Sequence, residues 1–594
     1  MCGIIGYIGK RQAQPILLGC LAKLEYRGYD SCGIALAGSS LNIHKDAVRV
    51  GELAKAAPQL EGTVGIGHTR WATHGEPSRT NAHPHCDCTA KIAVVHNGII
   101  NNYQSLRQQL TSEGHKFVSE TDTEVISHLI EKYYQGDLEK AVETALRDVE
   151  GSYAIIVLMA GEPKLVVARK DSPLIIGIGD RENFIASDVP AILDFTNRVV
   201  YLEDGDVGVI TTDSMKIKRN GTEVTREKHK ILWSAEQAQK GGYEHFMLKE
   251  IHEQPKVIRD TLVGWVPVNG VVTDFALMRD IGVESILILG CGTSYHAALV
   301  GKYIVEELVG IPVRAELASE FNYYGQIPPR TRTIVITQSG ETADILIAMR
   351  RSREAGGKVI AITNVVGSTV SRMADQTIYT RAGPEISVAA TKSFMAQIMV
   401  LYWLMMSYSK VDAKRLADML LGLRQMPSKV QQVLDNEGKI LECAKYLSNF
   451  ENVFFIGRGI NFPIALEGAL KLKEISYIHA EGYAAGELKH GPFALLSGDT
   501  PVIAIVAQDN TREAMLTNIK EIKSRGAPLI VLAGEGDEAV EELADSVIRV
   551  PRIDAIYSPV INTVALQLLA YYTAKHRGCP IDFPRNLAKS VTVE

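Results

Sequence analysis

Short apolar runs separated by turns characterise the chain from its N-terminus to about Ile210. Residues 92–95, 153–158 and 164–167 are rich in the aliphatic and β-branched side chains typical of strands. Residues 123–134 and 138–149 instead place apolar side chains at helical spacing. Several strands with few helices predict a layered α+β domain with antiparallel sheets.

Farther along, apolar runs end in loops of small and hydroxyl-bearing residues, and a helical pattern follows each loop. Residues 285–289 lead into Gly290-Cys291-Gly292-Thr293-Ser294, residues 333–336 lead into Gln338-Ser339-Gly340-Glu341-Thr342, and residues 358–362 form a third run. This order of strand, glycine loop and helix predicts parallel βαβ units in an α/β doubly wound fold.

The same α/β pattern occurs twice. Residues 453–459 match residues 286–292, which lie 167 positions earlier, and residues 529–532 correspond to the third strand. We therefore expect two copies of one α/β subdomain, each with a helical tail.

These patterns predict five segments. They are a first domain over residues 2–215, a linker and docking segment over 216–254, the two α/β subdomains over 255–430 and 431–578, and a tail over 579–594. In the polar linker, Asn220-Gly221 is typical of a turn.

Composition and charge exclude several classes of function. The net charge of −6 and the lack of a basic tract argue against nucleic acid or an anionic membrane as the main partner. The N-terminus resembles no secretory signal, and the apolar stretch 394–406 contains Gln397 and is too short for a membrane span, which favours a buried core helix. Eight cysteines without scaffold spacing indicate a reducing cytoplasm.

Cys2 is the first candidate for chemistry. The small neighbour Gly3 favours removal of Met1, which would leave a free α-amino group beside the thiol as its own base. The alternative is that Cys2 is a buried residue at the start of a strand over residues 3–8.

Three further features offer partners for charged groups of a small substrate. Arg70, next to Trp71 and between His68 and His74, can bind a carboxylate in bidentate fashion. Asn97-Gly98 offers two donors for an oxyanion, although such a pair is more often a turn. Asp122 can pair with a substrate ammonium group or cap a helix.

Histidine and cysteine crowd together in His83-Pro84-His85-Cys86-Asp87-Cys88. The residue types suit zinc, but spacing this tight is poor for one tetrahedral ion, and no second cysteine pair accompanies it. We therefore expect no metal and no cofactor.

The first domain resembles the N-terminal-nucleophile glutamine amidotransferases. The resemblance is carried by Cys2-Gly3-Ile4 and by residues 26–31, 68–77, 81–85 and 96–98. It implies that Cys2 is the nucleophile and that Asn97 and Gly98 form the oxyanion hole. It further implies a glutamine site in which Arg70, His74, His83 and Asp122 bind substrate, Arg27 orders the site and Trp71 gates ammonia.

The two glycine loops of the first α/β copy suit a phosphate, because helix N-termini and hydroxyls supply hydrogen-bond donors. They match neither a P-loop nor a full dinucleotide fingerprint, and ordinary helix caps are the alternative. The second copy has Ala507-Gln508-Asp509 in the corresponding loop, so we expect phosphate binding in the first copy.

The second copy instead contains Glu467, Lys471 and Glu474 on one helix face, and His490 follows. These groups suit proton transfer, whereas a solvated charged face is the bland alternative. In the tail, Lys589 could form an imine with a carbonyl or belong to a disordered end.

These segments resemble a pair of sugar isomerase domains. Together with residues 243–251 and 587–594, they make nearly the whole chain similar to the isomerising glutamine–fructose-6-phosphate aminotransferases. The resemblance implies a fold in which an α+β N-terminal-nucleophile layered domain with antiparallel sheets joins two α/β sugar isomerase subdomains with parallel sheets.

The resemblance also implies an activity, partners and roles. L-Glutamine would give its amide nitrogen to D-fructose 6-phosphate, yielding D-glucosamine 6-phosphate for hexosamine biosynthesis, in a cytoplasmic homodimer. Glu474 would act as base with help from Lys471, His490 would open the ring, and Lys589 would contact the carbonyl while the tail closes the sugar site. The implied sugar-phosphate residues are Cys291, Gly292, Thr293, Ser294, Thr337, Gln338, Ser339, Thr342, Val388 and Glu467.

Two departures and two rivals accompany this hypothesis. Ala390 and Thr337 stand where the family often has serine, which puts one hydroxyl contact, at Ala390, in doubt. One rival is an amidotransferase with another acceptor, and the other is a non-enzymatic sugar-phosphate sensor.

The hypothesis also expects a dry passage for ammonia, because ammonium has no lone pair for attack on a carbonyl.

Overall fold

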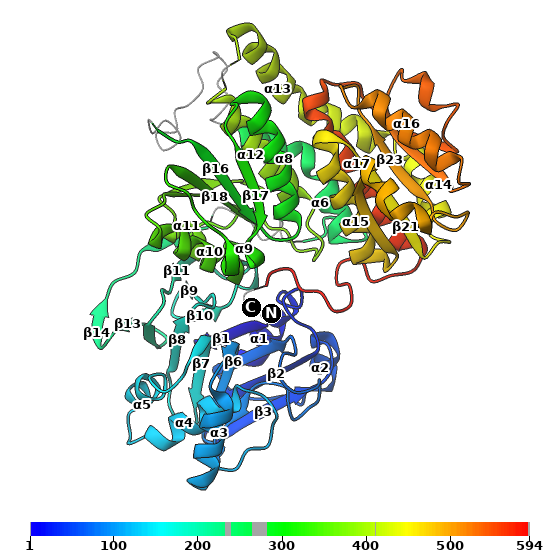
Figure 1. Ribbon diagram of the computed structural model, residues 1–594. Helices are drawn as coiled ribbons and strands as arrows, with labels where there is room; N and C mark the ends of the chain where they lie inside the picture. Colours follow the sequence, from blue (N-terminus) through cyan, green and yellow to red (C-terminus); the bar gives the residue numbers. More distant parts are fainter. Residues whose placement is uncertain (1, 232–238, 264–281, 410, 592–594) are drawn as a thin grey trace. The chain divides into compact units, whose positions relative to one another are not determined.

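The computed structural model describes residues 2–231, 239–263, 282–409 and 411–591 (Figure 1). The chain forms two compact units, residues 1–238 together with 588–594, and residues 239–587. The last residues of the chain thus belong to the N-terminal unit.

Two antiparallel sheets form the centre of the N-terminal unit. The eight-stranded sheet has the order β15-β11-β9-β10-β1-β4-β2-β3 and the seven-stranded sheet the order β14-β13-β12-β8-β7-β6-β5. The strands of the first sheet are β1 (Gly3–Ile8), β2 (Ser31–Ala37), β3 (Leu41–Asp46), β4 (Val64–Arg70), β9 (Ile175–Ile178), β10 (Asn183–Ala186), β11 (Arg198–Tyr201) and β15 (Lys228–Lys230). Those of the second are β5 (His85–Cys86), β6 (Ile92–Ile100), β7 (Gly151–Met159), β8 (Leu165–Lys170), β12 (Asp206–Ile210), β13 (Met215–Arg219) and β14 (Thr222–Val224).

Apolar side chains on both faces of each sheet produce four layers. Ile4 and Ile66 of the first sheet pack against Ile156 and Val167 of the second in a core between the sheets. The outer faces are covered by the helices α1 (Ala13–Ala22) and α2 (Val50–Ala56) on one side, and α3 (Tyr103–Ser112), α4 (Glu124–Tyr133) and α5 (Leu138–Ala145) on the other. The predicted layered α+β domain with antiparallel sheets is confirmed.

The structure differs from the sequence prediction at residues 216–230. This stretch, predicted as linker, forms most of β13 and all of β14 and β15, which are edge or near-edge strands of the two sheets. Only Ile217 of β13 is buried, since edge strands expose polar side chains to water. The predicted turn at Asn220-Gly221 is confirmed, and both residues have positive φ angles.

The C-terminal unit contains two five-stranded parallel sheets of identical topology. Their orders are β17-β16-β18-β19-β20 and β22-β21-β23-β24-β25, so the predicted duplication is confirmed. The first sheet contains β16 (Ser285–Gly290), β17 (Val313–Leu317), β18 (Thr331–Thr337), β19 (Val359–Thr363) and β20 (Gln376–Tyr379). The second contains β21 (Asn452–Gly457), β22 (His479–Ala484), β23 (Val502–Val506), β24 (Leu529–Gly534) and β25 (Ser546–Val550).

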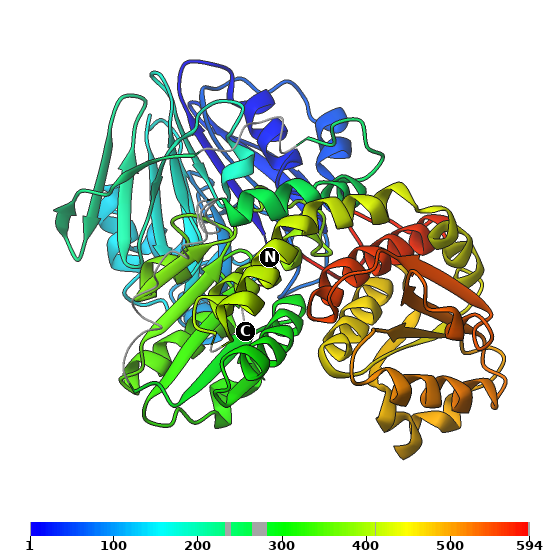
Figure 2. The same cartoon turned by 90° about the horizontal axis from the view of Figure 1, so that it is seen from above.

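Helices surround both sheets, and the view in Figure 2 shows the two subdomains of this unit side by side. The helices are α6 (Phe246–His252), α7 (Gln254–Leu262), α8 (Thr293–Leu308), α9 (Ala318–Tyr324), α10 (Ala343–Glu354), α11 (Thr369–Met373), α12 (Lys392–Met406), α13 (Ala413–Asp435), α14 (Gly438–Leu447), α15 (Phe462–Ser476), α16 (Arg512–Lys523) and α17 (Ser558–His576). One core joins the two subdomains through α8, α12, α15 and α17.

Helix α12 corresponds to the apolar stretch that the sequence assigns to a buried helix. Every side chain from Lys392 to Met406 is buried, so this prediction is confirmed. Among the helices that the structure describes, none is both long and apolar enough to cross a membrane.

The predicted docking segment folds into α6 and α7 against the C-terminal unit. The carboxylate of Asp582 accepts the N–H groups of Phe246 and Met247, at 2.9 and 3.0 Å, and thereby caps α6. His245 bonds to the hydroxyl of Tyr571 at 3.0 Å. These contacts connect the segment after residue 239 with the end of the chain.

Candidate active site

Cys2 lies immediately before the central strand β1 of the eight-stranded sheet. Gly3 pairs with Thr69 of β4, and a Cβ atom at Gly3 would lie 2.5 Å from the Thr69 hydroxyl, so β1 approaches β4 very closely here. The Trp71 N–H donates to the Cys2 Sγ at 3.2 Å. Burial raises the pKa of the Cys2 thiol, while the Trp71 N–H and Arg70 oppose that rise. A base is therefore needed to generate the thiolate.

Donors converge on the backbone next to Cys2. The Asn97 Nδ2 donates to the Cys2 carbonyl at 2.9 Å, and the Arg27 Nε donates to the same oxygen at 3.2 Å. Arg27 is buried and forms an ion pair with Asp188 at 2.9 Å. Asn97 thus reaches Cys2 from β6 of the other sheet.

Gly98 follows Asn97 in a conformation that suits glycine. Its φ angle is +133°, and a Cβ atom would lie 2.1 Å from the Ser152 carbonyl oxygen of β7. Asn97 and Gly98 stand within a strand pair rather than in a turn, which removes the turn alternative.

Arg70, at the end of β4, orders the loop that follows it. Its guanidinium donates to the carbonyls of His74, Gly75 at 2.8 Å and Glu76 at 3.3 Å. The His74 Nδ1 lies 3.9 Å from Asp122, whose other oxygen accepts the Ile100 N–H at 2.9 Å. The structure therefore brings His74 and Asp122 together, next to the loop that Arg70 holds.

The alternative role of Asp122 as a helix cap is not met. The capping position of α4 is Thr123, and no side chain caps this helix end.

His83 lies in a buried stack of histidines. Its ring packs flat on His68 at 3.9 Å, and its Nδ1 accepts the His96 N–H at 3.4 Å. Burial lowers the pKa of His83 well below its usual value and that of His68 to about 3. These contacts support the strand that carries Asn97, and no described contact joins His83 to Arg70, His74 or Asp122.

Trp71 and Lys589 both lie close to this site in the N-terminal unit. The Trp71 indole meets the Tyr29 ring edge-on at 5.8 Å. The backbone N–H of Lys589 donates to the carbonyl of Tyr26 at 3.4 Å, one residue before Arg27. The tail thus contacts the segment that holds the Cys2 carbonyl.

In the C-terminal unit, the two hydroxyl-rich loops follow adjacent parallel strands, β16 and β18. The Gln397 amide donates to the Ser294 hydroxyl at 3.0 Å, and the hydroxyls of Thr337 and Thr342 lie 3.0 Å apart. Neither α8 nor α10 is capped by a side chain, so the ordinary-cap alternative is not met. Carboxyl ends of neighbouring parallel strands are a common place for ligands.

Backbone contacts shape the rest of these loops. The Glu341 N–H donates to the Ser339 hydroxyl at 3.2 Å, and the Gln338 carbonyl accepts the Asn364 N–H at 3.1 Å. Gly292 precedes α8 with a φ angle of +52°. Burial raises the pKa of Cys291 to about 11, so this thiol is neutral at physiological pH.

Glu467 of the second subdomain contacts the first subdomain. The Thr293 hydroxyl donates to one Glu467 oxygen at 3.2 Å, and the His296 Nδ1 lies 2.7 Å from the other. The Lys471 Nζ lies 3.6 Å from Glu467 and 2.5 Å from Glu474. The predicted helix face is thus buried and paired rather than solvated, since Lys471 and Glu467 are at most 2% exposed.

Lys471 remains a cation in spite of its burial. Burial alone would lower its pKa, but Glu474 and Glu467 outweigh that effect and raise the pKa above its usual value. Lys471 therefore supplies a fixed positive charge next to Glu474.

His490 and Val388 occupy less connected positions. His490 ends the short helical segment Ala485–His490 and is exposed, and no described contact joins it to Lys471 or Glu474. Val388 is buried, and its N–H donates to the Asp582 carbonyl at 3.2 Å.

Four participants escaped the sequence analysis: the Trp71 backbone N–H, Asp188, His296 and Gln397. Each acts on a residue far away in the chain, so no local motif marks it. The only available signal is that His296 lies just after Thr293 and Ser294 in the glycine loop.

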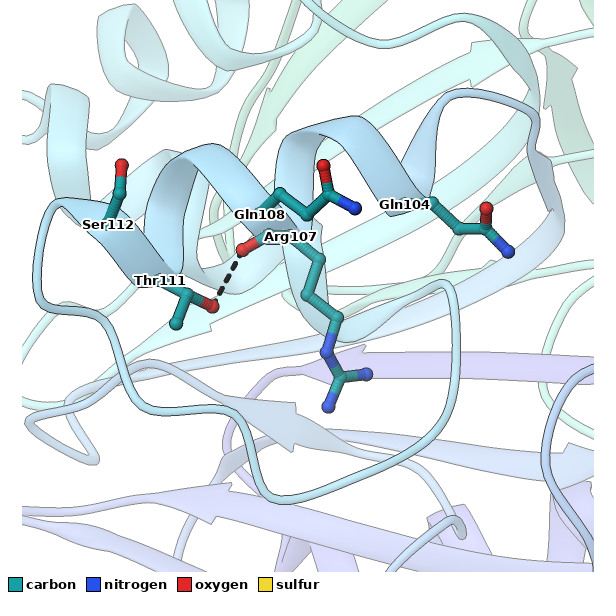
Figure 3. Close-up of a pocket in the computed structure, with 5 residues that line it drawn as sticks. All are labelled: Gln104, Arg107, Gln108, Thr111 and Ser112. Carbon is teal, nitrogen blue, oxygen red and sulfur yellow. Dashed lines mark hydrogen bonds between the residues drawn. The ribbon is translucent and has the colours of Figure 1, made fainter.

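A surface pocket lies along α3 (Figure 3). It is lined by Gln104, Arg107, Gln108, Thr111 and Ser112 of that one helix, and the Thr111 hydroxyl is already bonded to the Arg107 carbonyl. We assign no chemistry to it.

Comparisons with known proteins match both halves of the chain. The profile of the glutamine amidotransferase domain matches residues 68–194, and that of the SIS domain matches residues 281–407 and 446–577. The chain is 49% identical over 613 residues to a glutamine–fructose-6-phosphate aminotransferase (isomerizing) of Caldanaerobacter subterraneus subsp. tengcongensis, with all of both chains covered. The same coverage holds for the Methanosarcina acetivorans protein of that name, at 50% identity over 618 residues.

This chain belongs to the isomerising glutamine–fructose-6-phosphate aminotransferases. The predicted resemblance is confirmed over the full length, and the family is one of enzymes. A solved structure agrees: the C-terminal domain of the glucosamine-fructose-6-phosphate aminotransferase from Francisella tularensis matches 58% of this chain and all of its own, at 36% identity and a TM-score of 0.56. In this aminotransferase, the two SIS domains form the C-terminal unit.

The buried neutral imidazoles predict acid sensitivity of the N-terminal unit. The pKa of the His68 imidazole is about 3 in the folded chain and 6.5 in the unfolded chain. As the pH falls, the unfolded chain therefore binds the proton before the folded chain does. Stability is complete above pH 6.5 and falls as the pH drops towards 3, by up to about 1.4 kcal/mol per pH unit for one histidine. The variant His68→Gln should show a shallower dependence of its unfolding midpoint between pH 7 and 5. His229→Gln, on the edge strand β15, is the matched control with an unchanged slope; equal slopes in all three proteins would contradict the prediction.

Proposed function

We propose that this aminotransferase moves the amide nitrogen of L-glutamine to D-fructose 6-phosphate, isomerises the adduct to D-glucosamine 6-phosphate and releases L-glutamate. The observation that carries the proposal is the full-length match to aminotransferases of this kind, in a chain that contains a glutamine amidotransferase domain and two SIS domains. The reaction would begin hexosamine biosynthesis.

The first half-reaction takes place at Cys2. The Sγ forms a bond with the side-chain carbonyl carbon of glutamine, the C–N bond breaks, and ammonia leaves behind a thioester that water hydrolyses to glutamate. After removal of Met1, the α-amino group of Cys2 would accept the thiol proton and return it to the leaving nitrogen. Asn97 Nδ2 and the Gly98 N–H would stabilise the oxyanion.

Charged groups near Cys2 suit the amino-acid end of glutamine. Arg70 is a cation for the α-carboxylate, and Asp122, with His74 beside it, is an anion for the α-ammonium group. Arg27 holds the Cys2 carbonyl through its pairing with Asp188, and we propose that it orders the site. Trp71 keeps its proposed role as the gate for ammonia, and His83, which stacks on His68, keeps its proposed role in glutamine binding.

The second half-reaction takes place in the C-terminal unit. Hydroxyls and N–H groups of Ser294, Thr337, Gln338, Ser339 and Thr342 would bind the phosphate, with residues 291–293, Val388 and Glu467 around the sugar. Ammonia adds to the C2 carbonyl and water leaves. Glu474 then takes a proton from C1 and a proton is delivered to C2, while the C1 hydroxyl loses a proton and the nitrogen gains one, which gives the amino aldose.

Lys471 lies 2.5 Å from Glu474 and would steady the negative charge of the intermediate. His490 would open the ring, and Lys589 would contact or condense with the open-chain carbonyl. Both roles rest on the family resemblance.

We also propose that the enzyme works in the cytoplasm as a homodimer, in line with its composition and the family resemblance. Light scattering of the purified chain should give the mass of two chains. A mass of one chain at the concentration used for activity would reject the dimer.

Replacement of Cys2 should separate the two half-reactions. Cys2→Ala removes the nucleophile, so turnover with glutamine should fall by at least about 1,000-fold. Formation of glucosamine 6-phosphate from fructose 6-phosphate and ammonium salts should persist, since the sugar site is untouched. Loss of both activities in a folded variant would contradict the assignment of roles.

Gly340 offers a test of the phosphate loop. Its φ angle is +68°, and a Cβ atom would lie 2.1 Å from the Ser368 hydroxyl, so Gly340→Ala must move the loop. We expect the KM for fructose 6-phosphate to rise at least tenfold, about 1.4 kcal/mol of lost binding. Glutamine hydrolysis at Cys2 without sugar should change little.

Gly356→Ala is the matched control for Gly340→Ala. Gly356 also has a positive φ angle, +77°, but nothing lies within 4 Å of its added Cβ atom. It should keep the KM of the parent enzyme. A similar KM in both variants would reject the assignment of this loop to the phosphate.

A further inference from the structure

Four potential metal ligands gather in the N-terminal unit, outside the glutamine site. Cys88 lies just after β5, His115 lies in the loop after α3, and His128 and Glu131 lie on α4. Their ligand atoms all lie within 4.8 Å of one another. Neither the glutaminase chemistry nor the sugar chemistry uses any of these side chains.

The separations fit a tetrahedral ion. The Cys88 Sγ lies 3.5 Å from the His128 Nδ1 and 3.7 Å from the His115 Nδ1. The Glu131 Oε2 lies 3.0 Å from the His115 Nδ1 and 3.4 Å from the His128 Nδ1. Bonds of zinc to nitrogen, oxygen and sulfur of about 2.0–2.3 Å in a tetrahedron require ligand atoms roughly 3.3–3.6 Å apart. Small side-chain rotations would complete the site.

The surroundings resemble the outer shell of a metal site. The Lys116 N–H donates to the Cys88 Sγ at 3.4 Å, which suits a thiolate, and the Cys88 N–H donates to Glu131 at 3.2 Å. The second ring nitrogen of His128 lies 3.7 Å from the buried carboxylate of Glu124. A carboxylate behind a ligating imidazole fixes its orientation and its tautomer.

Glu124 is itself held in place. It accepts the N–H groups of Val118 and Ser119 at 2.8 and 2.7 Å, so it cannot simply swing away from His128. Burial would raise the pKa of Glu124, but the nearby His128 imidazole and the hydrogen bonds from residues 118 and 119 outweigh that effect and lower the pKa. The second ring nitrogen of His128 therefore faces a fixed anion.

The charges of the four groups identify the class of ion. One thiolate and one carboxylate carry two negative charges, and the two imidazoles are neutral ligands. Together they balance the charge of a divalent cation. A thiolate with two imidazoles favours zinc over the hard ions magnesium and calcium. Because zinc binds the thiolate form of cysteine, the incoming ion must displace the thiol proton of Cys88.

We propose that Cys88, His115, His128 and Glu131 bind one zinc ion in a structural site. Four protein ligands leave no open position for a substrate, which distinguishes it from a catalytic zinc site. The expectation of no metal from the sequence is thereby revised. That expectation rested on the close spacing of residues 83–88, of which only Cys88 participates; its partners lie 27 to 43 residues away.

The ion would join three segments of the N-terminal unit: the end of β5, the loop after α3, and α4. Asp122 lies two residues before α4. Zinc bound to α4 would therefore also hold in place this carboxylate, which we propose binds the ammonium group of glutamine. Removal of zinc should therefore lower the thermal midpoint of the N-terminal unit and raise the KM for glutamine. The chemistry at Cys2 does not require the ion.

The test is metal uptake by the untagged full-length chain. The protein is treated with a chelator, loaded with zinc, passed through gel filtration and analysed for metal. We expect about one zinc per chain. With cobalt instead of zinc, we expect strong visible absorption of a tetrahedral ion and a thiolate-to-cobalt charge-transfer band in the near ultraviolet.

Variants identify the ligands. Cys88→Ser and His115→Asn, both outside helices and strands, should bind zinc at least about tenfold more weakly and lose the charge-transfer band. Cys86→Ser is the matched control, because it removes a neighbouring thiol that is not a proposed ligand. It should bind zinc as the parent chain does. Cys2→Ala should also bind zinc normally, which excludes the catalytic thiol as the ligand. Circular dichroism of each variant shows whether it is folded.

Three results at the proposed ligands would overturn the proposal. They are a parent chain that retains no zinc, equal zinc retention in folded Cys88→Ser and His115→Asn, and a cobalt spectrum without a thiolate band. Loss of zinc from Cys2→Ala alone would also overturn it, because the metal would then belong to the glutamine site.

Discussion

The buried carboxylate of Glu467 is the constraint on which the C-terminal unit depends. A carboxylate removed from water costs several kcal/mol unless it is fully paired. Here the partners come from both repeats: Thr293 and His296 from the first and Lys471 from the second. The repeats must therefore pack with α8 against α15 for the charge to be satisfied.

The same pairing positions the chemistry. A continuous line of contacts leads from the glycine loop through Glu467 and Lys471 to Glu474. The hydroxyl-rich loops at the ends of β16 and β18 are thereby fixed relative to Glu474, the proposed base. In the N-terminal unit, the backbone of Cys2 is the analogous point: Asn97 and Arg27 bind one carbonyl from two different elements. In both units, groups distant in sequence meet at one buried polar centre.

The amino-acid sequence predicts much of this molecule. The alternation of apolar runs and glycine loops predicted the parallel repeats, because strands buried on both faces leave continuous apolar segments. The prediction from the sequence failed for residues 216–230, because edge strands with one buried side chain have the composition of a linker. Motifs singled out Cys2, Arg70 and the hydroxyl-rich loops as candidates for chemistry, and their roles are proposals.

What the sequence could not provide is long-range pairing. Arg27 and Asp188 are 161 residues apart, and His296 and Glu467 are 171 apart, so no spacing rule connects them. The cluster around Cys88 was invisible for the same reason: a search for ligands close in sequence finds residues 83–88, whereas the fold brings His115, His128 and Glu131 to Cys88. The stacking of His83 on His68 is likewise a contact that no spacing rule predicts.

The central claim is that one chain passes nitrogen from glutamine to the sugar. It is tested most directly with glutamine labelled with ¹⁵N in the amide, fructose 6-phosphate, and an excess of unlabelled ammonium at neutral pH. The account predicts glucosamine 6-phosphate that carries the label nearly undiluted, with one glutamate formed per product. Product that contains mainly unlabelled nitrogen, or glutamate formed without amino sugar, would contradict it.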